Sequence, residues 1–332
     1  MEFERNELSK NSKGGTELIM ERLYNTLPEE LLSKFQIIPS RVRQLDEKKV
    51  RILYAHDLPE DPESENAFRR NGGWARFNKI VFVSHWQRNQ FVKEYEIDWS
   101  KTAVIQNSII PFERKEKPKG QIKFIYHTTP HRGLNILVAV FKKLYEKYGD
   151  EIHLDVYSSF EIYGWPERDQ PFLEMFEEIK NHPGMTYHGF KPNDVIRTAL
   201  SDGHIYAYPS IWPETSCISL MEAMGAGLIC VHPDSAALPE TSGGWTYMYP
   251  WHENLDQHAQ MFLNVSDLAV QQAKANLEKE TFFDGKLSSQ MSYINLFHNW
   301  EVKKHHWEAL LNNLKNESTE LKKSFRVFKY HA

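Results

Sequence analysis

The most informative stretch of the chain runs from Pro213 to Gly227 and reads PETSCISLMEAMGAG. Glu214 follows a strand-like apolar run at residues 205–208, and Glu222 stands eight positions later, inside a segment with a helical pattern. One acid is therefore predicted at the carboxyl end of a strand, and the other at least one turn into the next helix. The helix start between them presents unpaired backbone N–H groups and the positive end of the helix dipole, which together bind anions such as phosphates. This arrangement suits a nucleotide diphosphate attached to a sugar.

The segment resembles the signature of retaining glycosyltransferases of family 4, which have the two-domain GT-B fold. That signature is a glutamate, seven residues and a second glutamate, followed by alanine and a turn of small residues. The preceding strand, the spacing and the following turn all agree here, whereas the bare spacing of two glutamates arises by chance in many chains. The alternative is an ordinary strand–helix unit with solvated acids. The resemblance implies an α/β protein with two Rossmann-like parallel-sheet domains facing a cleft and a C-terminal helix that crosses back.

Composition agrees with a folded two-domain protein. The chain has 332 residues, of which 41% are apolar, so two cores of ordinary size can form. A net charge of −5 argues against a surface that binds nucleic acid everywhere, although local basic patches stay compatible with it. The two cysteines, Cys217 and Cys230, imply no disulfide framework and are predicted to be small buried side chains with free thiols.

Targeting signals are not evident in the sequence. The charged amino terminus, MEFERNE, lacks the apolar segment of a signal peptide, and no apolar run approaches the roughly 18 residues of a spanning helix. The expected location is the cytoplasm, or the host cytoplasm for a viral protein.

The order of apolar runs predicts two domains. The charged stretch 113–120, ERKEKPKG, has the composition of a linker. We predict an acceptor-side domain at 1–117, a nucleotide-sugar domain at 118–285 and a helical segment at 286–332. Short strands alternate with helices on both sides of the linker, which is typical of parallel sheets built from βαβ units. The strands are predicted at 50–54, 80–84, 104–106, 122–126, 152–157, 185–187, 205–208 and 228–232, and the last helix at 292–314.

Further positions match the family. No apolar strand precedes the glycine loop at 14–15, although the family normally begins with one. A histidine follows a strand at position 56. The stretch 127–133, HTTPHRG, looks like a variant of the family's basic motif, with a histidine where the commoner form has a second cation. The turn at 187–191 matches the one that holds the base. The resemblance thus implies donor-binding residues Gly14, Gly15, Thr128, Arg132, Gly189, Phe190, Ser216, Cys217, Ile218 and Glu222.

The implied mechanism is a retaining transfer. Glu222 binds the ribose hydroxyls, while Arg132 and the helix start hold the diphosphate and stabilise its developing charge. Glu214 and His56 are the implied catalytic residues beside the sugar, although a lone histidine after a strand is as often structural. The donor is expected to be UDP- or GDP-linked. No metal or other cofactor is expected, because GT-B enzymes usually need none and the chain contains no Asp-x-Asp.

The acceptor stays open. A glycan or lipid-linked glycan is expected first, because enzymes of this type most often act on these. The stretch 66–79, NAFRRNGGWARFNK, is basic with interleaved aromatic residues, so a membrane surface or DNA with hydroxymethylated bases are alternatives. A third interpretation is a solvated surface whose rings pack into the core. The residues in question are Arg69, Arg70, Trp74 and Arg76.

Proteins of another class use the same fold. A sugar-nucleotide epimerase would convert the donor without an acceptor, and a non-catalytic binding protein would hold it without turnover. The intact pair of glutamates argues against a copy that has lost activity.

Overall fold

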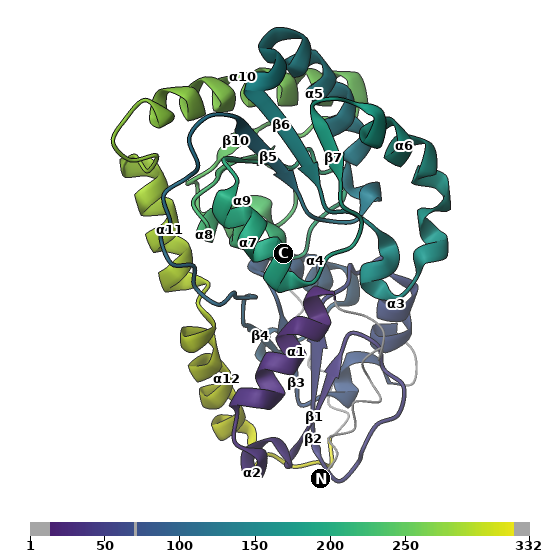
Figure 1. Ribbon diagram of the computed structural model, residues 1–332. Coiled ribbons are helices and arrows are strands. Elements are labelled where there is room, and N and C mark those ends of the chain that lie inside the picture. The colour runs from purple at the N-terminus through teal and green to yellow at the C-terminus, as the bar shows by residue number, and fades with distance from the viewer. Residues whose placement is uncertain (1–13, 70–71, 322–332) are drawn as a thin grey trace, which may run out of the picture. The chain divides into compact units, whose positions relative to one another are not determined.

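The computed structural model describes residues 14–69 and 72–321 (Figure 1). Their contacts form two compact units: Gly14–Ser108 together with residues 300–321, and Ile109–Asn299. Each unit contains one sheet in which all strand pairs are parallel. The predicted α/β architecture of two Rossmann-like domains is thus confirmed.

The first unit has a four-stranded sheet in the order β1-β2-β3-β4. Its strands are β1 (Phe35–Pro39), β2 (Val50–Ala55), β3 (Lys79–Phe82) and β4 (Thr102–Val104). All six residues of β2 are buried, as expected for an inner strand that is covered on both faces. The helices of this unit are α1 (Gly15–Thr26), α2 (Glu29–Leu32), α3 (Pro62–Arg69), α4 (His85–Tyr95), α12 (Trp300–Leu314) and the short 3-10 helices η2 (Gly73–Arg76) and η3 (Trp99–Lys101).

Strand β1 was not predicted from the sequence. It is an edge strand, paired with β2 from Phe35 opposite Val50 to Pro39 opposite Tyr54. An edge position tolerates a proline, which in an isolated sequence argues against a strand. The expectation that no apolar strand precedes Gly14 falls on residues 1–13, which lie outside the described residues.

The second unit has six parallel strands in the order β10-β9-β8-β5-β6-β7. They are β5 (Ile122–Tyr126), β6 (Ile152–Val156), β7 (Met185–Tyr187), β8 (Ile205–Ala207), β9 (Ile229–Pro233) and β10 (Tyr247–Tyr249). The chain fills the sheet from β5 to one side and then returns to start again at β8, next to β5. Ligands of such sheets bind outside the carboxyl ends of the strands at this switch point.

Helices complete the second unit. They are α5 (Leu134–Tyr148), α6 (Leu173–Asn181), α7 (Asn193–Asp202), α8 (Ile218–Gly225), α9 (Leu238–Ser242), α10 (Leu255–Leu277) and α11 (Gly285–Phe297), with 3-10 helices η4 (Pro130–Arg132), η5 (Gly149–Glu151), η6 (Phe160–Tyr163) and η7 (Pro166–Phe172). Helix α10 packs on α5, and α11 packs on α8. In Figure 1, α5 and α10 run together beside the sheet.

The predicted linker at 113–120 is exposed except at Lys117, but the chain just before it is packed. Ile109 and Phe112 lie in the core of the second unit. Lys117 is buried, and its Nζ donates to the carbonyls of Leu200, Ser201 and Ala226 at 2.8–3.1 Å, near the C-terminal ends of α7 and α8. The lysine amine thus supplies donors to carbonyls in the last turns of both helices, where the helical ladder of hydrogen bonds ends. The units accordingly divide at residues 108 and 109, whereas the functional limit at 117 stays a prediction.

The predicted helix 292–314 is wrong as a single element. The chain forms α11 and α12 with a break at His298 and Asn299. At the break the carbonyl of His298 accepts a hydrogen bond from the N–H of Ile109 at 2.8 Å. This carbonyl therefore takes part in an isolated β-bridge and does not continue the helix. Helix α12 belongs to the first unit, where the buried Trp307 ring lies edge-on to Tyr54 of β2 at 4.9 Å. The return of the C-terminal helix to the first domain is therefore confirmed.

A buried histidine couples the stability of the second unit to pH. His204 Nδ1 accepts from the N–H of Lys123 at 3.0 Å, and its Nε2–H donates to the carbonyl of Pro118 at 2.9 Å. Burial lowers the pKa of His204 to about 4. Between its unfolded pKa of about 6.5 and the folded value, only the unfolded state binds the proton, so stability falls as the pH falls.

We expect His204→Gln to remove this contribution. The unaltered protein should lose about 2 kcal/mol more unfolding free energy between pH 7 and pH 5 than the variant does. Urea unfolding at the two pH values measures the difference. An identical loss in both proteins would show that His204 titrates normally.

Candidate functional site

Two loops meet at the switch point of the second sheet. The loop after β5 contains η4, and the loop after β8 leads into α8. Strands β5 and β8 are paired neighbours, with Phe124 opposite Ile205. Residues that follow these strands are therefore brought to one edge of the sheet, where βαβ sheets bind ligands. The predicted Arg132 comes from the first loop and Glu214 from the second.

Glu214 forms an ion pair with Arg132. The carboxylate is only 4% exposed, and it accepts hydrogen bonds from Arg132 Nη1 and from the hydroxyl of Tyr208. A buried carboxylate is stable only when it is paired in this way. The sequence predicted both charged residues but contained no signal for Tyr208. Its hydroxyl reaches the Glu214 carboxylate because the loop between the two residues bends back.

Glu222 is the second buried acid, at 3% exposure. Asn193 at the start of α7 donates through Nδ2 to both carboxylate oxygens, at 2.9 and 3.2 Å. Arg197, one turn further along α7, places Nη1 at 3.7 Å from Oε1. Sequence analysis missed both partners because no local pattern links the start of α7 to α8.

Several buried polar atoms at this edge have no hydrogen-bond partner among the residues that the structure describes. They are His127 Nε2, Thr129 Oγ1, Arg132 Nε and Ser216 Oγ. Buried donors and acceptors of this kind are rare in folded proteins unless a ligand or water bonds to them. Their types, a guanidinium, hydroxyls and an imidazole, suit the oxygen atoms of a phosphate or a sugar.

The motif after β5 supplies one cation at neutral pH. Burial lowers the pKa of His127 to about 4, and burial and the nearby Arg132 also lower that of His131 to about 4. Both rings are therefore neutral at pH 7, and Arg132 carries the charge of this loop. Thr128 is half-buried in the same loop.

The start of α8 has the predicted form. Cys217 is the N-cap residue and makes no side-chain capping bond, so the N–H groups of the first turn are not satisfied by a cap. Burial raises the pKa of the Cys217 thiol to about 12, which keeps it protonated and agrees with a packing role. Ser216 and Ile218 flank it, at half-buried positions.

The predicted base-binding turn follows β7. Gly189 has a φ of +65°, which favours glycine, and its missing Cβ would face open space apart from the edge of Tyr187. Phe190 is half-buried beside it. His188 stacks on Tyr157 at 4.3 Å and bonds to Asp155 at 2.7 Å, which fixes the turn to β6.

Three predicted residues belong to the first unit. Gly14 is the N-cap of α1, and Gly15 is the first residue of that helix. His56 follows β2, lies edge-on to Tyr54 at 4.1 Å, and its backbone N–H donates to Ser40 Oγ at 2.9 Å. Burial lowers the pKa of His56 to about 3, so its ring is neutral at physiological pH.

The basic stretch 66–79 turns its rings into the core of the first unit. Phe68 and Phe77 are buried, and Trp74 Nε1 donates to the carbonyl of Tyr95 at 3.2 Å. Arg69 forms an ion pair with Glu94, while Arg76 donates to the carbonyls of Gly73 and Ala67 at 3.1 and 2.8 Å. Arg70 lies outside the described residues.

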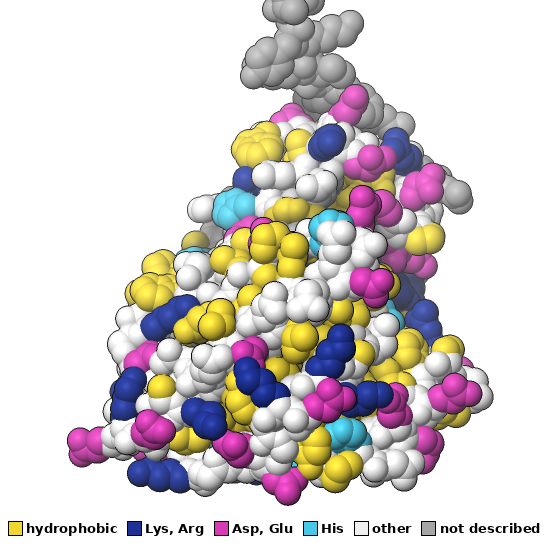
Figure 2. All heavy atoms as spheres, turned by 90° about the horizontal axis from the view of Figure 1, so that it is seen from above, with side chains coloured by type: hydrophobic (Ala, Val, Ile, Leu, Met, Phe, Trp, Pro, Cys, Tyr) yellow, Lys and Arg dark blue, Asp and Glu magenta, His cyan; other side chains and the backbone are white. Residues whose placement is uncertain are grey.

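These bonds agree with the interpretation of a surface whose rings pack inward, and nothing in the structure supports DNA as the acceptor. The Arg69 side chain is half exposed in its ion pair, and the acceptor role of the stretch stays a prediction. On the face seen in Figure 2, which is viewed from above Figure 1, Lys and Arg side chains are interspersed with Asp and Glu.

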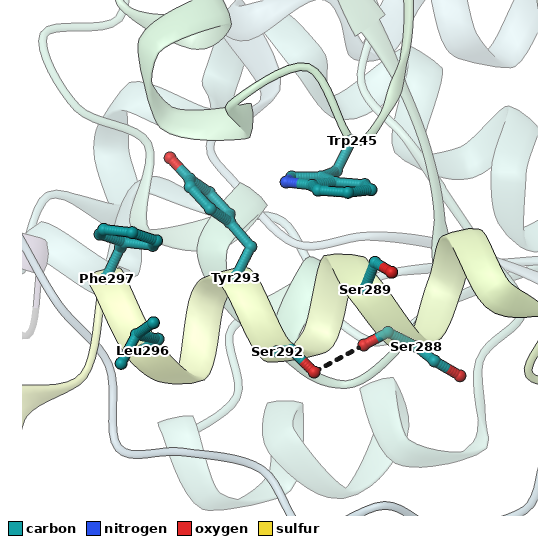
Figure 3. Close-up of a pocket in the computed structure, with 7 residues that line it drawn as sticks. All are labelled: Trp245, Ser288, Ser289, Ser292, Tyr293, Leu296 and Phe297. Atoms are coloured by element: carbon teal, nitrogen blue, oxygen red, sulfur yellow. Dashed lines mark hydrogen bonds between the residues drawn. The ribbon is translucent and has the colours of Figure 1, made fainter.

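A separate depression lies along α11 (Figure 3). It has a volume of about 410 Å³ and is shallow and mostly apolar. None of the predicted site residues lines it, so it is distinct from the edge of the sheet described above. Its lining consists of Trp245, Ser288, Ser289, Ser292, Tyr293, Leu296 and Phe297.

The described residues contain neither a candidate metal site nor a candidate membrane-spanning helix. Within residues 14–69 and 72–321, no three or more His, Cys, Asp or Glu side chains are grouped so as to hold a metal ion. None of the helices in these ranges has the length and apolar character needed to span a membrane.

Comparison with known proteins places the site in a recognised family segment. Residues 106–245 match the sequence profile of the family described as Glycosyl transferases group 1. This range contains both glutamates, Arg132 and the turn at Gly189. A search of curated protein sequences finds no match.

Solved structures share the fold at low sequence identity. The pneumococcal O-GlcNAc transferase GtfA, in complex with UDP and GlcNAc, is 13% identical with a TM-score of 0.61 over 82% of this chain and 54% of that protein. The Anabaena protein HepE, in complex with UDP and glucose, is 14% identical with a TM-score of 0.63 over 80% and 72%. WaaG, a glycosyltransferase involved in lipopolysaccharide biosynthesis, is 11% identical with a TM-score of 0.60 over 90% and 81%.

The chain spans about half the length of the pneumococcal protein. At these identities the solved structures establish the fold, which is that of GT-B glycosyltransferases. The family match covers the segment that holds the paired acids, and it supports a glycosyltransferase.

Proposed function

We propose that the protein is a retaining, metal-independent glycosyltransferase of family 4 that transfers a hexosyl or pentosyl group from a nucleotide diphosphate sugar to an acceptor hydroxyl. One observation carries the proposal: Glu214, Glu222 and Arg132 gather on the loops and helix that follow β5 and β8, at the switch point of the second sheet. Ligands of such sheets bind at this point, and these groups match the parts of a nucleotide sugar.

Each group has a role in the bound donor. Glu222 accepts hydrogen bonds from the ribose hydroxyls, and the turn at Gly189 and Phe190 holds the base. Arg132 and the N–H groups of Ser216, Cys217 and Ile218 hold the diphosphate, with Thr128 beside them. Glu214 hydrogen-bonds to the donor sugar. The family resemblance assigns Gly14 and Gly15 to donor binding and His56 to a catalytic role, and these roles stay predictions from the sequence.

The transfer balances without a cofactor. The bond between the anomeric carbon and the diphosphate oxygen breaks as the acceptor oxygen bonds to the same carbon, on the face that the nucleotide leaves. A phosphate oxygen of the leaving nucleotide takes the proton of the acceptor hydroxyl. Arg132 and the start of α8 stabilise the charge that builds on the diphosphate. A glycosidase is not favoured, because hydrolases place both acids around one glycosidic bond.

UDP is the favoured nucleotide and a glycan or lipid-linked glycan the favoured acceptor. Two of the three solved structures named above contain UDP, and the third protein is involved in lipopolysaccharide biosynthesis. The sequence by itself allows a GDP-linked donor equally.

Thermal denaturation with nucleotides tests the proposal. A ligand that binds only the folded state stabilises it, by about 2.7 kcal/mol at a hundred times its Kd. We expect UDP or UDP-sugars to raise the melting temperature by several degrees, with GDP, ADP and CMP as comparisons. Incubation with the stabilising sugar nucleotide and a panel of glycans should then release UDP. No shift with any nucleotide, or an isomerised sugar nucleotide without UDP release, would contradict the proposal.

Glu222→Ala is expected to weaken UDP binding by at least about tenfold, because two hydrogen bonds to a charged group are lost. Titration calorimetry measures the affinity, and circular dichroism checks that the variant is folded. Unchanged affinity would remove Glu222 from the ribose site.

A further inference from the structure

Helix α7 holds the acid that we assign to the ribose. Asn193 bonds to both oxygens of Glu222, and Arg197 approaches Oε1 to 3.7 Å. The carboxylate lies on α8, so two side chains from a neighbouring helix fix its orientation. A distance of 3.7 Å is an electrostatic contact rather than a hydrogen bond. The guanidinium therefore acts on the charge and on the direction of the acid.

Arg197 is itself held by the segment that enters the second unit. Its Nη2 donates to the carbonyl of Pro111 at 3.1 Å, and its guanidinium carbon lies 3.6 Å from the centre of the Phe112 ring. A planar guanidinium on an aromatic face is a favourable and directional contact, stronger where water is excluded. Phe112 is buried, so it forms a fixed seat for Arg197.

Gly225, three residues after Glu222, lets the segment that contains Ile109 and Phe112 approach α8. A Cβ at Gly225 would lie 2.9 Å from Ile109 Cδ1 and 3.2 Å from Phe112 Cδ2. Both side chains belong to the core of the second unit. The turn of small residues that follows the second glutamate is thus explained by packing, and it places Phe112 against the end of the helix that carries Glu222.

We propose that Arg197 is a positioning residue that sets the selectivity of the site for ribose, with Phe112 as its seat. Arg197 keeps the Glu222 carboxylate turned toward the two sugar hydroxyls, and it touches the nucleotide only through that acid. The inference rests on the proposed function. It goes beyond that function by assigning the recognition of the ribose diol to a relay from residue 112 to residue 197 to residue 222.

The relay predicts a loss that is confined to ribose recognition. UDP and 2′,3′-dideoxyuridine 5′-diphosphate differ only in the hydroxyls that Glu222 would bind. Titration calorimetry of both nucleotides gives a preference ratio for each variant. In the unaltered protein we expect UDP to bind at least about thirtyfold more tightly, as two hydrogen bonds to a charged group imply.

Arg197→Met should lower this ratio by about tenfold through weaker UDP binding, while the affinity for the dideoxy nucleotide changes less than about twofold. Arg197→Lys keeps the charge but loses the planar stacking, and it should recover part of the ratio. Phe112→Leu keeps an apolar core residue and removes the aromatic seat, so it should also lower the ratio. Arg197→Met combined with Glu222→Ala should bind UDP no more weakly than Glu222→Ala alone.

Arg114→Met is the matched control. Arg114 also stacks on a ring, 4.5 Å from the centre of Phe283, and donates to Thr281 at 3.0 Å, in the same unit. It has no contact with Glu222 among its interactions in the described structure. Its removal should leave the ratio unchanged.

The outcomes distinguish a failure of the relay from a failure of the proposed function. A ratio that survives in both Arg197→Met and Phe112→Leu, or an equal loss for both nucleotides, overturns the relay while UDP binding itself still supports the donor site. Failure of the unaltered protein to bind any nucleoside diphosphate overturns the proposed function and the relay with it. If Arg197→Met does not fold, Arg197→Lys and Phe112→Leu decide the question by the same ratio.

Discussion

Replacement of Gly133 by alanine is expected to lower the free energy of unfolding of the second unit by about 4 kcal/mol or more, as the sum of backbone strain and steric overlap. Gly133 ends η4 with a φ of +109°, which L residues rarely adopt. A Cβ there would lie 2.2 Å from the carbonyl oxygen of Pro209 and 3.0 Å from its carbonyl carbon. Neither backbone can yield without moving the loops after β5 and β8 apart.

The chain supplies a control for the strain alone. Gly120 has a φ of +108°, and a Cβ at that position would meet nothing within 4 Å. Gly120→Ala should therefore cost only the backbone term, about 1–2 kcal/mol. Urea unfolding followed by tryptophan fluorescence compares the two variants. A similar loss in both would show that the contact with Pro209 relaxes at little cost, so that the close approach of the two loops is not a constraint.

Gly133→Ala should also affect the site if the variant folds. The residue before it, Arg132, pairs with Glu214 from the loop after β8. Moving the loops apart lengthens this pair and displaces the cation assigned to the diphosphate. We therefore expect UDP affinity to fall together with stability, whereas Gly120→Ala should keep its affinity.

Glu214→Gln is expected to reduce sugar transfer by about 10²–10³, with UDP affinity changed less than about threefold. The size of the effect follows from what the loss of one positioned polar group beside a reacting centre costs in other enzymes. Glutamine keeps the volume of the buried side chain but removes the charge and turns one acceptor into a donor. The rate of UDP release from the donor sugar nucleotide, with a glycan or with water as acceptor, measures the effect.

Tyr208→Phe tests the hydrogen bond to Glu214 separately from the charge of its carboxylate. This change removes the hydroxyl that bonds to Glu214 while the ion pair with Arg132 stays. We expect a loss of less than about tenfold, as for one neutral hydrogen bond. If Glu214→Gln keeps more than a tenth of the activity, the carboxylate has no role beside the sugar. If Tyr208→Phe loses as much as Glu214→Gln, the hydrogen bond rather than the charge is what the reaction needs.

Local patterns in the sequence predicted many of the strands and helices. Apolar runs and helical periodicity predicted β2, β3, β5 to β9 and α8 near their observed positions, because those segments are buried in a way that local patterns record. The same stretch placed Glu214 after a strand and Glu222 in the next helix, since both positions depend only on the order of residues along the chain. Strand β1 was not predicted, because its edge position and its proline weaken the local pattern of a strand.

Contacts between distant parts of the chain were decided by the tertiary structure alone. The strand order places β8 beside β5, and only that order brings Arg132 to Glu214 across 82 positions of sequence. Asn193 and Arg197 reach Glu222 because α7 packs on α8. Which side chains meet across a core depends on how whole helices and strands pack. The periodic pattern of apolar residues along the chain carries no information on that packing.

Two charged segments show that composition does not predict which side chains are buried or paired. The stretch 113–120 has the composition of a linker, but Lys117 is buried on the carbonyls at two helix ends. The stretch 66–79 has the composition of a binding patch, but its rings lie in the core and its described arginines bond to the fold. Composition reports which groups are present, whereas their burial and pairing depend on surfaces that only the folded chain brings together.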